Sequence, residues 1–351
     1  MAYEWNMGQY ASTNTRASGT FTKQLSNDLS TQFVSYINSI GLKDEDGNTL
    51  SLSTSTNNSG TYYDYLKSVI ETSLNNFLAD TTFPYTPSST ERPDGGFGGG
   101  GKRSLATTYN SVEDYISSLN SDETWVTYNS TSNTATISSV GSFVTHCKNP
   151  SKDVGAFDDL SKSQAENKLF GINSSYSVAH FDKYMSNLLS SNSNAYSSLS
   201  NWDSSYPTSY SSDIQLKDSL GNTVQHRLNM YNPLYYLLSS YDGYNTSKVA
   251  SNFRINTGIT QGDTANCVEM NLALALKNFG KNVEFTTVWD QAHTTAERGG
   301  SNYSTTNFIS WVAECMGVSN STSDSSNNKD SSAINIKIAL LNIIIFMGLL
   351  I

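Results

Sequence analysis

Residues 252–317 read NFRINTGITQGDTANCVEMNLALALKNFGKNVEFTTVWDQAHTTAERGGSNYSTTNFISWVAECMG. A β-rich run predicts a strand over 252–259, and apolar residues at helical spacing predict a helix over 264–279. A second strand is predicted over 283–289, and a last helix ends at Gly317. The stretch therefore predicts an α/β unit in which a helix connects two strands.

An acid and a base follow the two predicted strands. Asp263 lies in the polar turn after the first strand, and His293 lies in the loop after the second. In α/β-hydrolases the catalytic residues follow the order Ser, Asp or Glu, then His, each after a strand. Histidine can take and return a proton near neutral pH, and a carboxylate can hold its tautomer. We predict Asp263 as the triad acid and His293 as the base, and rank Asp290 behind Asp263.

Several blocks of this sequence resemble the bacterial tannase-like, feruloyl-esterase-like α/β-hydrolases. The blocks that resemble their C-terminal part are LNMYNPLYYL, TGITQGDTA, NLALALKNFGKNVEF and TVWDQAHTTAERGG. The blocks that resemble their large lid are RASGTFTKQLSND, GTYYDYLKSVIETSLNNFLADTTFPY and LSKSQAENKLFG. The resemblance extends over residues 1–318 and implies a carboxylic ester hydrolase with a Ser-Asp-His acyl-enzyme mechanism. It also implies a small aromatic or plant-derived ester as substrate, and no cofactor.

The nucleophile of that family lies on a Gly-x-Ser-x-Gly elbow before the lid. No such pentapeptide occurs in this sequence, and the nearest imitation, 317–321, follows the histidine. Residues 1–19 also lack the pattern of a signal peptide. We therefore expect the second half of a hydrolase, inactive as this chain alone. The alternative is a non-catalytic cell-surface glycoprotein or binding protein derived from such a hydrolase.

The expected fold class is a partial α/β-hydrolase, with the last two strand–helix units and a large, mostly helical lid insertion. Residues 1–228 form the predicted lid, in which amphipathic helices are expected over 21–40 and 62–78. The predicted hydrolase core follows over 229–318. A linker rich in Ser and Asn is predicted over 319–332 and a hydrophobic tail over 333–351.

The formal net charge of −10 argues against nucleic-acid binding, because no basic stripe can displace counterions from phosphates. His146, His180 and His226 are scattered without metal-ligand spacing, so they are interpreted as packing or surface residues and no metal site is predicted. Cys267 and Cys315 lie on the two helices beside the candidate site. Two separate thiols are favoured over a disulfide there. Nothing in the sequence indicates an oligomeric state.

The hydrophobic tail predicts attachment to a membrane. A small-residue polar spacer followed by IALLNIIIFMGLLI at 338–351 is typical of a GPI-attachment signal. The competing interpretation is a plain C-terminal membrane anchor. Six Asn-x-Ser/Thr sequons agree with a secreted or cell-surface glycoprotein.

Overall fold

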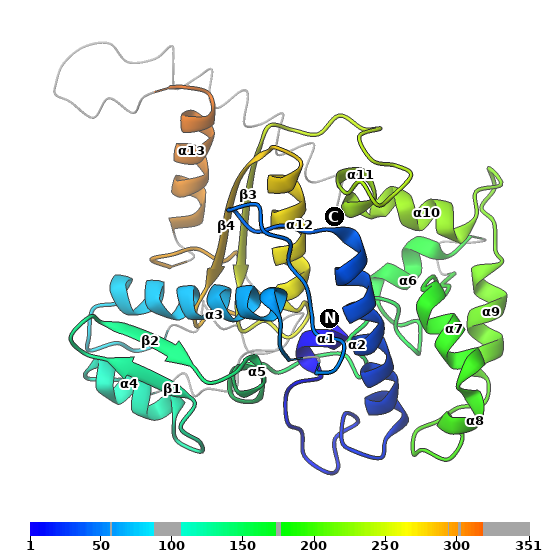
Figure 1. Cartoon of the computed structure of the whole chain (residues 1–351), viewed down its shortest axis with the longest axis horizontal. Coiled ribbons are helices and arrows are strands. Elements are labelled where there is room, and N and C mark those ends of the chain that lie inside the picture. The colour runs from blue at the N-terminus through cyan, green and yellow to red at the C-terminus, as the bar shows by residue number, and fades with distance from the viewer. Residues whose placement is uncertain (57, 88–106, 173–176, 294, 301–302, 319–351) are drawn as a thin grey trace. The chain divides into compact units, whose positions relative to one another are not determined.

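The computed structural model describes residues 1–56, 58–87, 107–172, 177–293, 295–300 and 303–318 of the chain. The chain divides into two compact units, Met1–Thr306 and Asn307–Ile351. The described part of the second unit consists mainly of helix α13 (Ser304–Cys315), which begins at the last residues of the first. All other described elements belong to the first unit (Figure 1).

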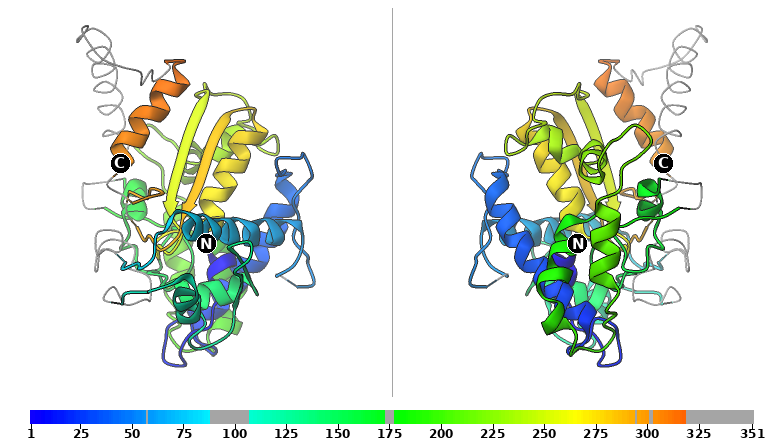
Figure 2. Two further views of the ribbon diagram at one scale, coloured as in Figure 1. Left: turned by 90° about the vertical axis from the view of Figure 1, so that its left-hand side faces the viewer. Right: turned by 90° about the vertical axis from the view of Figure 1, so that its right-hand side faces the viewer.

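The strands of the predicted α/β unit form a parallel pair. Strand β3 (Asn252–Gly258) pairs with β4 (Asn282–Val288) in the register Asn252↔Asn282 to Gly258↔Val288. A parallel pair requires a crossover connection, and helix α12 (Asn266–Asn278) supplies it. Figure 2 shows α12 along one face of the two strands. The strands and the helix confirm the order predicted for 252–289.

Glycine fixes the geometry of this unit at two positions. Gly280, which follows the C-cap residue Phe279 of α12, has φ +76°, a conformation that an L side chain rarely adopts. At Gly258 a Cβ atom would lie 2.0 Å from the carbonyl oxygen of Ala292, so only glycine allows the loop after β4 to approach the end of β3. That approach brings the two candidate loops together.

The two long helices predicted in the first 80 residues are confirmed as α2 (Phe21–Ile40) and α3 (Thr61–Asp80). The hydroxyl of Thr20 caps α2 by accepting from the backbone N–H of Lys23, and Gly41 ends it in the left-handed region. One face of α3 is fully buried because it packs against the main hydrophobic core, and it consists of Tyr62, Leu66, Ile70 and Leu74. The Ser73 hydroxyl of α3 donates to the carbonyl of Thr287, which fixes α3 at the carboxyl end of β4.

The remaining elements are mostly short. They are α1 (Ala2–Trp5), α4 (Val112–Leu119), β1 (Val126–Asn129), β2 (Thr134–Ile137), α5 (Val140–Cys147), α6 (Ala165–Phe170), α7 (Lys183–Ser191), α8 (Ser193–Tyr196), α9 (Tyr206–Ile214), α10 (Val224–Tyr231) and α11 (Pro233–Leu237). Strands β1 and β2 form an antiparallel hairpin. Both sheets of the described residues have two strands.

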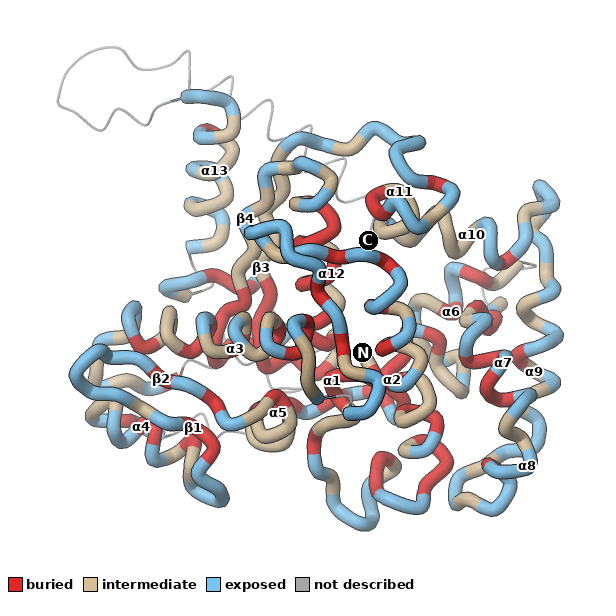
Figure 3. Tube along the Cα trace, viewed as in Figure 1, coloured by how far each residue is buried: buried red, intermediate tan, exposed pale blue. Residues whose placement is uncertain are grey.

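One hydrophobic cluster contains residues from both predicted regions, among them Tyr3, Leu66 and Phe143 before residue 228 and Met270 and Trp289 after it. The domain boundary at 228/229 stays a prediction. Burial along β3 and β4 is greatest at their carboxyl ends, as Figure 3 shows. This edge of the sheet is where the candidate catalytic loops lie.

The helices in the described part of the chain are all too short or too polar to cross a lipid bilayer. The predicted linker at 319–332 and the predicted tail at 333–351 lie outside the described residues.

Candidate active site

The loops after β3 and β4 are hydrogen-bonded to each other. The backbone N–H of Ile259 donates to Val288 O at 3.0 Å, and that of Thr260 donates to Gln291 O at 3.0 Å. The hydroxyl of Thr260 donates to the same Gln291 oxygen at 2.7 Å. Because the carboxyl ends of parallel strands meet at one edge, these bonds bring the loop of Asp263 to the loop of His293.

His293 is exposed, and its ring is held by an amide. Its Nδ1 lies 3.1 Å from Oε1 of Gln261, and an amide oxygen can only accept, so Nδ1 is the donor. Within the described part of the chain, no hydrogen bond or ion pair joins His293 to Asp263. The predicted base therefore contacts a residue two positions before the predicted acid.

Gln261 is itself fixed on every side. Its Nε2 donates to the Thr257 hydroxyl at 2.5 Å and to Oε1 of Glu269 at 3.0 Å. Its backbone carbonyl accepts from Nζ of Lys148 at 3.0 Å. With 5 % of its surface exposed, Gln261 cannot exchange these partners for water. Nothing in the sequence pattern singled it out, because glutamine carries no acid–base chemistry of its own.

Asp263 is half-buried and faces the segment that follows α5. The hydroxyl of Ser151 donates to its Oδ1 at 3.4 Å, and the backbone N–H of Ser151 donates to Gly262 O at 2.7 Å. These contacts anchor the loop from its outer side. The role of Asp263 as triad acid stays a prediction.

Asp290 is buried in the turn after β4. Its φ of +61° places it in the left-handed region, which Asp tolerates better than most residues. The hydroxyl of Tyr85 donates to its Oδ2 at 3.2 Å. Asp290 therefore has a structural place in this turn, and as a candidate acid it stays ranked behind Asp263.

A buried group of charges lies behind the candidate loops. Nζ of Lys148 lies 3.9 Å from Oε1 of Glu4, and neither side chain is exposed to solvent. Burial lowers the pKa of Lys148, and the carboxylates of Glu4 and Glu269 oppose that shift. Glu4 also accepts from the backbone N–H of Cys267 at 3.0 Å, so its negative charge lies at the N-terminus of α12.

Glu269 connects this charged group to Gln261. Burial raises the pKa of Glu269 to about 7, and the ammonium of Lys148 works in the opposite direction. Within the part of the chain that the structure describes, its buried Oε2 has no hydrogen-bond partner, which disfavours the ionised form. Glu269 is therefore a carboxyl group whose charge changes close to neutral pH.

The three cysteines are free thiols, so the two separate thiols favoured for Cys267 and Cys315 are confirmed. Cys267 is fully buried, and burial raises its pKa to about 12. It is protonated at neutral pH and is no candidate for a nucleophile.

A hydrogen-bonded His–Asp pair lies between α6, α7 and α9. Nδ1 of His180 lies 2.8 Å from Oδ1 of Asp158, and the ring stacks on Tyr210 with centroids 3.5 Å apart. His180 is 1 % exposed, so no substrate can reach it. The interpretation of His180 as a packing residue is confirmed, although its carboxylate partner, 22 positions earlier, could not be recognised from the sequence.

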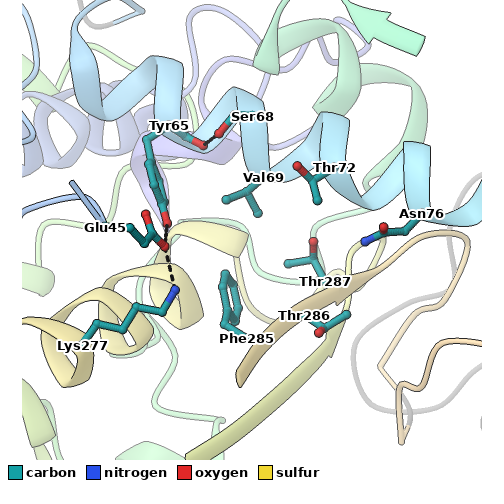
Figure 4. A pocket seen from close by; sticks show the side chains of 10 residues that line it. All are labelled: Glu45, Tyr65, Ser68, Val69, Thr72, Asn76, Lys277, Phe285, Thr286 and Thr287. Atoms are coloured by element: carbon teal, nitrogen blue, oxygen red, sulfur yellow. Dashed lines mark hydrogen bonds and ion pairs between the residues drawn. The ribbon is translucent and has the colours of Figure 1, made fainter. Parts of the chain in front are cut away.

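A pocket of about 310 Å³ lies between α3, α12 and β4, and neither Asp263 nor His293 lines it. At one end, Glu45 accepts from the hydroxyl of Tyr65 at 2.8 Å and pairs with Lys277 at 2.6 Å (Figure 4). The side chains that line the rest are Ser68, Val69, Thr72, Asn76, Phe285, Thr286 and Thr287. Apart from the Glu45–Lys277 ion pair, the pocket is thus mainly hydroxyl and amide in character, with the two aromatic rings of Tyr65 and Phe285.

No protein-family model matches this chain, and neither does any of the curated proteins. Solved structures do share its fold. Fusobacterium nucleatum tannase is 22 % identical with a TM-score of 0.55, and the match covers 89 % of this chain and 55 % of that one. Tannase from Lactobacillus plantarum in the orthorhombic crystal is 20 % identical with a TM-score of 0.53, covering 90 % and 54 %. A mercury derivative of tannin acyl hydrolase is 21 % identical with a TM-score of 0.52, covering 90 % and 53 %.

The chain spans about half the length of these tannases, as their coverage of 53 % to 55 % shows. At such identities the likeness establishes the fold alone. It confirms the resemblance that the sequence blocks indicated. The chain shares its fold with about half of a bacterial tannase.

Proposed function

We propose that this chain carries the acid–base side of a carboxylic ester hydrolase site, with His293 as general base. The observation that supports this most directly is the position of His293. It is exposed at the carboxyl edge of a parallel strand pair, and its Nδ1 is held by Gln261. Within the described part of the chain its Nε2 has no partner, so this nitrogen is available to accept a proton.

The proposed reaction is acyl transfer through a covalent intermediate. Nε2 of His293 would take the proton of a serine hydroxyl as that oxygen attacks the ester carbonyl, and would return it to the leaving alcohol. A Gly-x-Ser-x-Gly elbow has no counterpart in residues 1–351, so the reaction requires a chain that carries one. The proposed substrate class, small aromatic or plant-derived esters, follows the tannase likeness. Asp263, which the sequence predicts as the triad acid, is proposed as the acidic residue of the same site.

The test is hydrolysis of a simple aryl ester by the protein made from the longest reading frame that contains residues 1–351. If the frame includes the elbow, we expect turnover that His293→Ala lowers by at least about 1,000-fold. His226→Ala, at an exposed histidine of α10, is the matched control and should leave turnover unchanged. Equal turnover in the native protein and in His293→Ala would refute the role of His293.

A non-catalytic binding function is the second candidate, and the pocket of Figure 4 favours it. Thr72, Asn76 and Thr286 line the pocket, and their side chains have no hydrogen-bond partner within the described part of the chain. Free hydroxyl and amide groups beside the Phe285 ring suit an uncharged polyhydroxylated ligand such as a sugar.

Calorimetric titration with a simple glycoside tests the binding function. Thr286→Val should weaken binding at least about fivefold, because one hydrogen bond contributes about 1 kcal/mol. Thr127→Val, on the exposed face of β1, removes a hydroxyl outside the pocket and should not weaken it. No binding, or the same loss in both variants, would exclude this pocket as the site.

For the hydrophobic tail at 333–351, we propose attachment to the cell surface through a GPI anchor. Release of the protein from intact cells by a phosphatidylinositol-specific phospholipase tests the proposal. A protein that stays with the membrane after this treatment would favour the plain anchor.

A further inference from the structure

We propose that Gln261 is the positioning residue of His293, and that Glu269 fixes the direction of the Gln261 amide. The catalytic meaning of this arrangement rests on the proposed function, whereas the arrangement itself can be tested without any reaction. A neutral amide would then stand where a hydrolase triad has a carboxylate.

The direction of the amide follows from its partners. When Glu269 is ionised its carboxylate oxygens only accept, so the group that points from Gln261 to Glu269 is then the amide nitrogen. The same nitrogen lies 2.5 Å from the hydroxyl of Thr257, which can accept as well. The carbonyl Oε1 is left to face Nδ1 of His293. Nδ1 consequently carries the proton in the neutral ring, and Nε2 keeps its lone pair.

The backbone of Gln261 is held as firmly as its side chain. Lys148 donates to the carbonyls of Gln261 and Thr264, at 3.0 and 3.3 Å, so both halves of the loop are fixed to one buried ammonium. Thr260, directly before Gln261, is bonded to Gln291 of the opposite loop by its backbone and by its hydroxyl. The position of the Gln261 amide is therefore set before any ligand binds.

The electrostatic consequence separates this arrangement from a His–Asp pair. A carboxylate at Nδ1 stabilises the imidazolium that forms when the base takes a proton, and an amide can only orient the ring. The charged groups around this edge are Glu269 and Lys148 behind Gln261, Asp263 in the same loop, and Asp290 and Glu297 in the loop of His293. None of these carboxylates is hydrogen-bonded to His293 within the described residues, so its imidazolium lacks a paired charge.

An exchange of the two side chains tests the proposal and leaves the net charge unchanged. In the double variant Gln261→Glu with Glu269→Gln, the new carboxylate at position 261 faces His293. The new amide at position 269 can donate a hydrogen bond to that carboxylate. We expect the NMR titration midpoint of the His293 ring to rise by about one pH unit, a tenfold gain in proton affinity. At high pH, ¹⁵N shifts of the native ring should show the proton on Nδ1, and Gln261→Met should release it to the Nε2–H form.

Asp263→Asn is the matched control, since it neutralises the carboxylate that the chain order favours. It should move the midpoint by less than about 0.3 pH units, because the Asp263 carboxylate accepts from Ser151 and makes no hydrogen bond to His293 within the described residues. A downward shift of about one unit in this variant, or an unchanged midpoint in the double variant, would overturn the role of Gln261. If the titrations behave as expected but no elbow-containing frame hydrolyses an ester, the proposed function fails and the positioning by Gln261 stands.

Discussion

Two of the histidine sites in the first unit, those of His180 and His293, have opposite properties. His180 has a carboxylate partner at 2.8 Å, as a catalytic base would, but it is buried under Tyr210. Within the described residues the hydrogen-bond partner of His293 is a neutral amide, yet its ring is exposed at the strand edge where α/β-hydrolases place their base. A His–Asp contact is therefore not sufficient evidence for a catalytic site. The comparison teaches that access and position in the fold must be considered together with the hydrogen-bond partner.

The largest effect on the free energy of unfolding should come from the buried His180–Asp158 pair. Asp158 accepts from His180 and also from the backbone N–H groups of Phe181 and Asp182, at 2.6 and 2.7 Å. Asp158→Ala leaves these buried donors unpaired and should lower the free energy of unfolding by about 3 kcal/mol, measured by urea denaturation. Asp158→Asn, which keeps an acceptor, should cost less. Equal stability of Asp158→Ala and the native protein would contradict the structural role of this pair.

A smaller, pH-dependent effect on the free energy of unfolding is expected from Glu269, which holds the Gln261 amide beside His293. The pKa of Glu269 is raised from its ordinary value of 4.5 to about 7 in the folded chain. Its contribution to stability is therefore fully present below about pH 4.5 and is lost as the pH rises through about 7. Glu269→Gln removes this loss and should raise the free energy of unfolding by about 1–2 kcal/mol at pH 8.

At pH 4 the same substitution should change the free energy of unfolding by less than about 0.5 kcal/mol, since the native carboxyl is then protonated. Denaturation curves at the two pH values provide the measurement. A gain of equal size at both would mean that the charge of Glu269 is not responsible.

The smallest effect on stability should come from His293 itself. Its ring is exposed and makes one described side-chain hydrogen bond, to Gln261. His293→Ala should change the free energy of unfolding by less than about 1 kcal/mol. His180→Ala, which opens a buried space beside Tyr210, should cost more than 2 kcal/mol by the same measurement. Similar losses in both variants would remove the contrast between the two sites.

The sequence by itself determined the β3–α12–β4 unit. The helical spacing of apolar residues over 264–279 and the glycine after it depend on local periodicity and backbone sterics, which act within a few residues. It also placed Asp263 and His293 at one edge, because the carboxyl ends of parallel strands must meet. The blocks that resemble tannases agreed with the fold found in the structure.

Only the tertiary structure decided which side chain meets His293. Gln261 and Asp263 are two residues apart, and chain order favours the carboxylate. The path of their loop is set by Lys148 and Ser151, more than 100 positions earlier in the chain. Those contacts hold Asp263 beside Ser151 and Gln261 beside His293. The hydrogen-bond partner of His293 depends on contacts between distant segments of the chain, so no local pattern of residues predicts it.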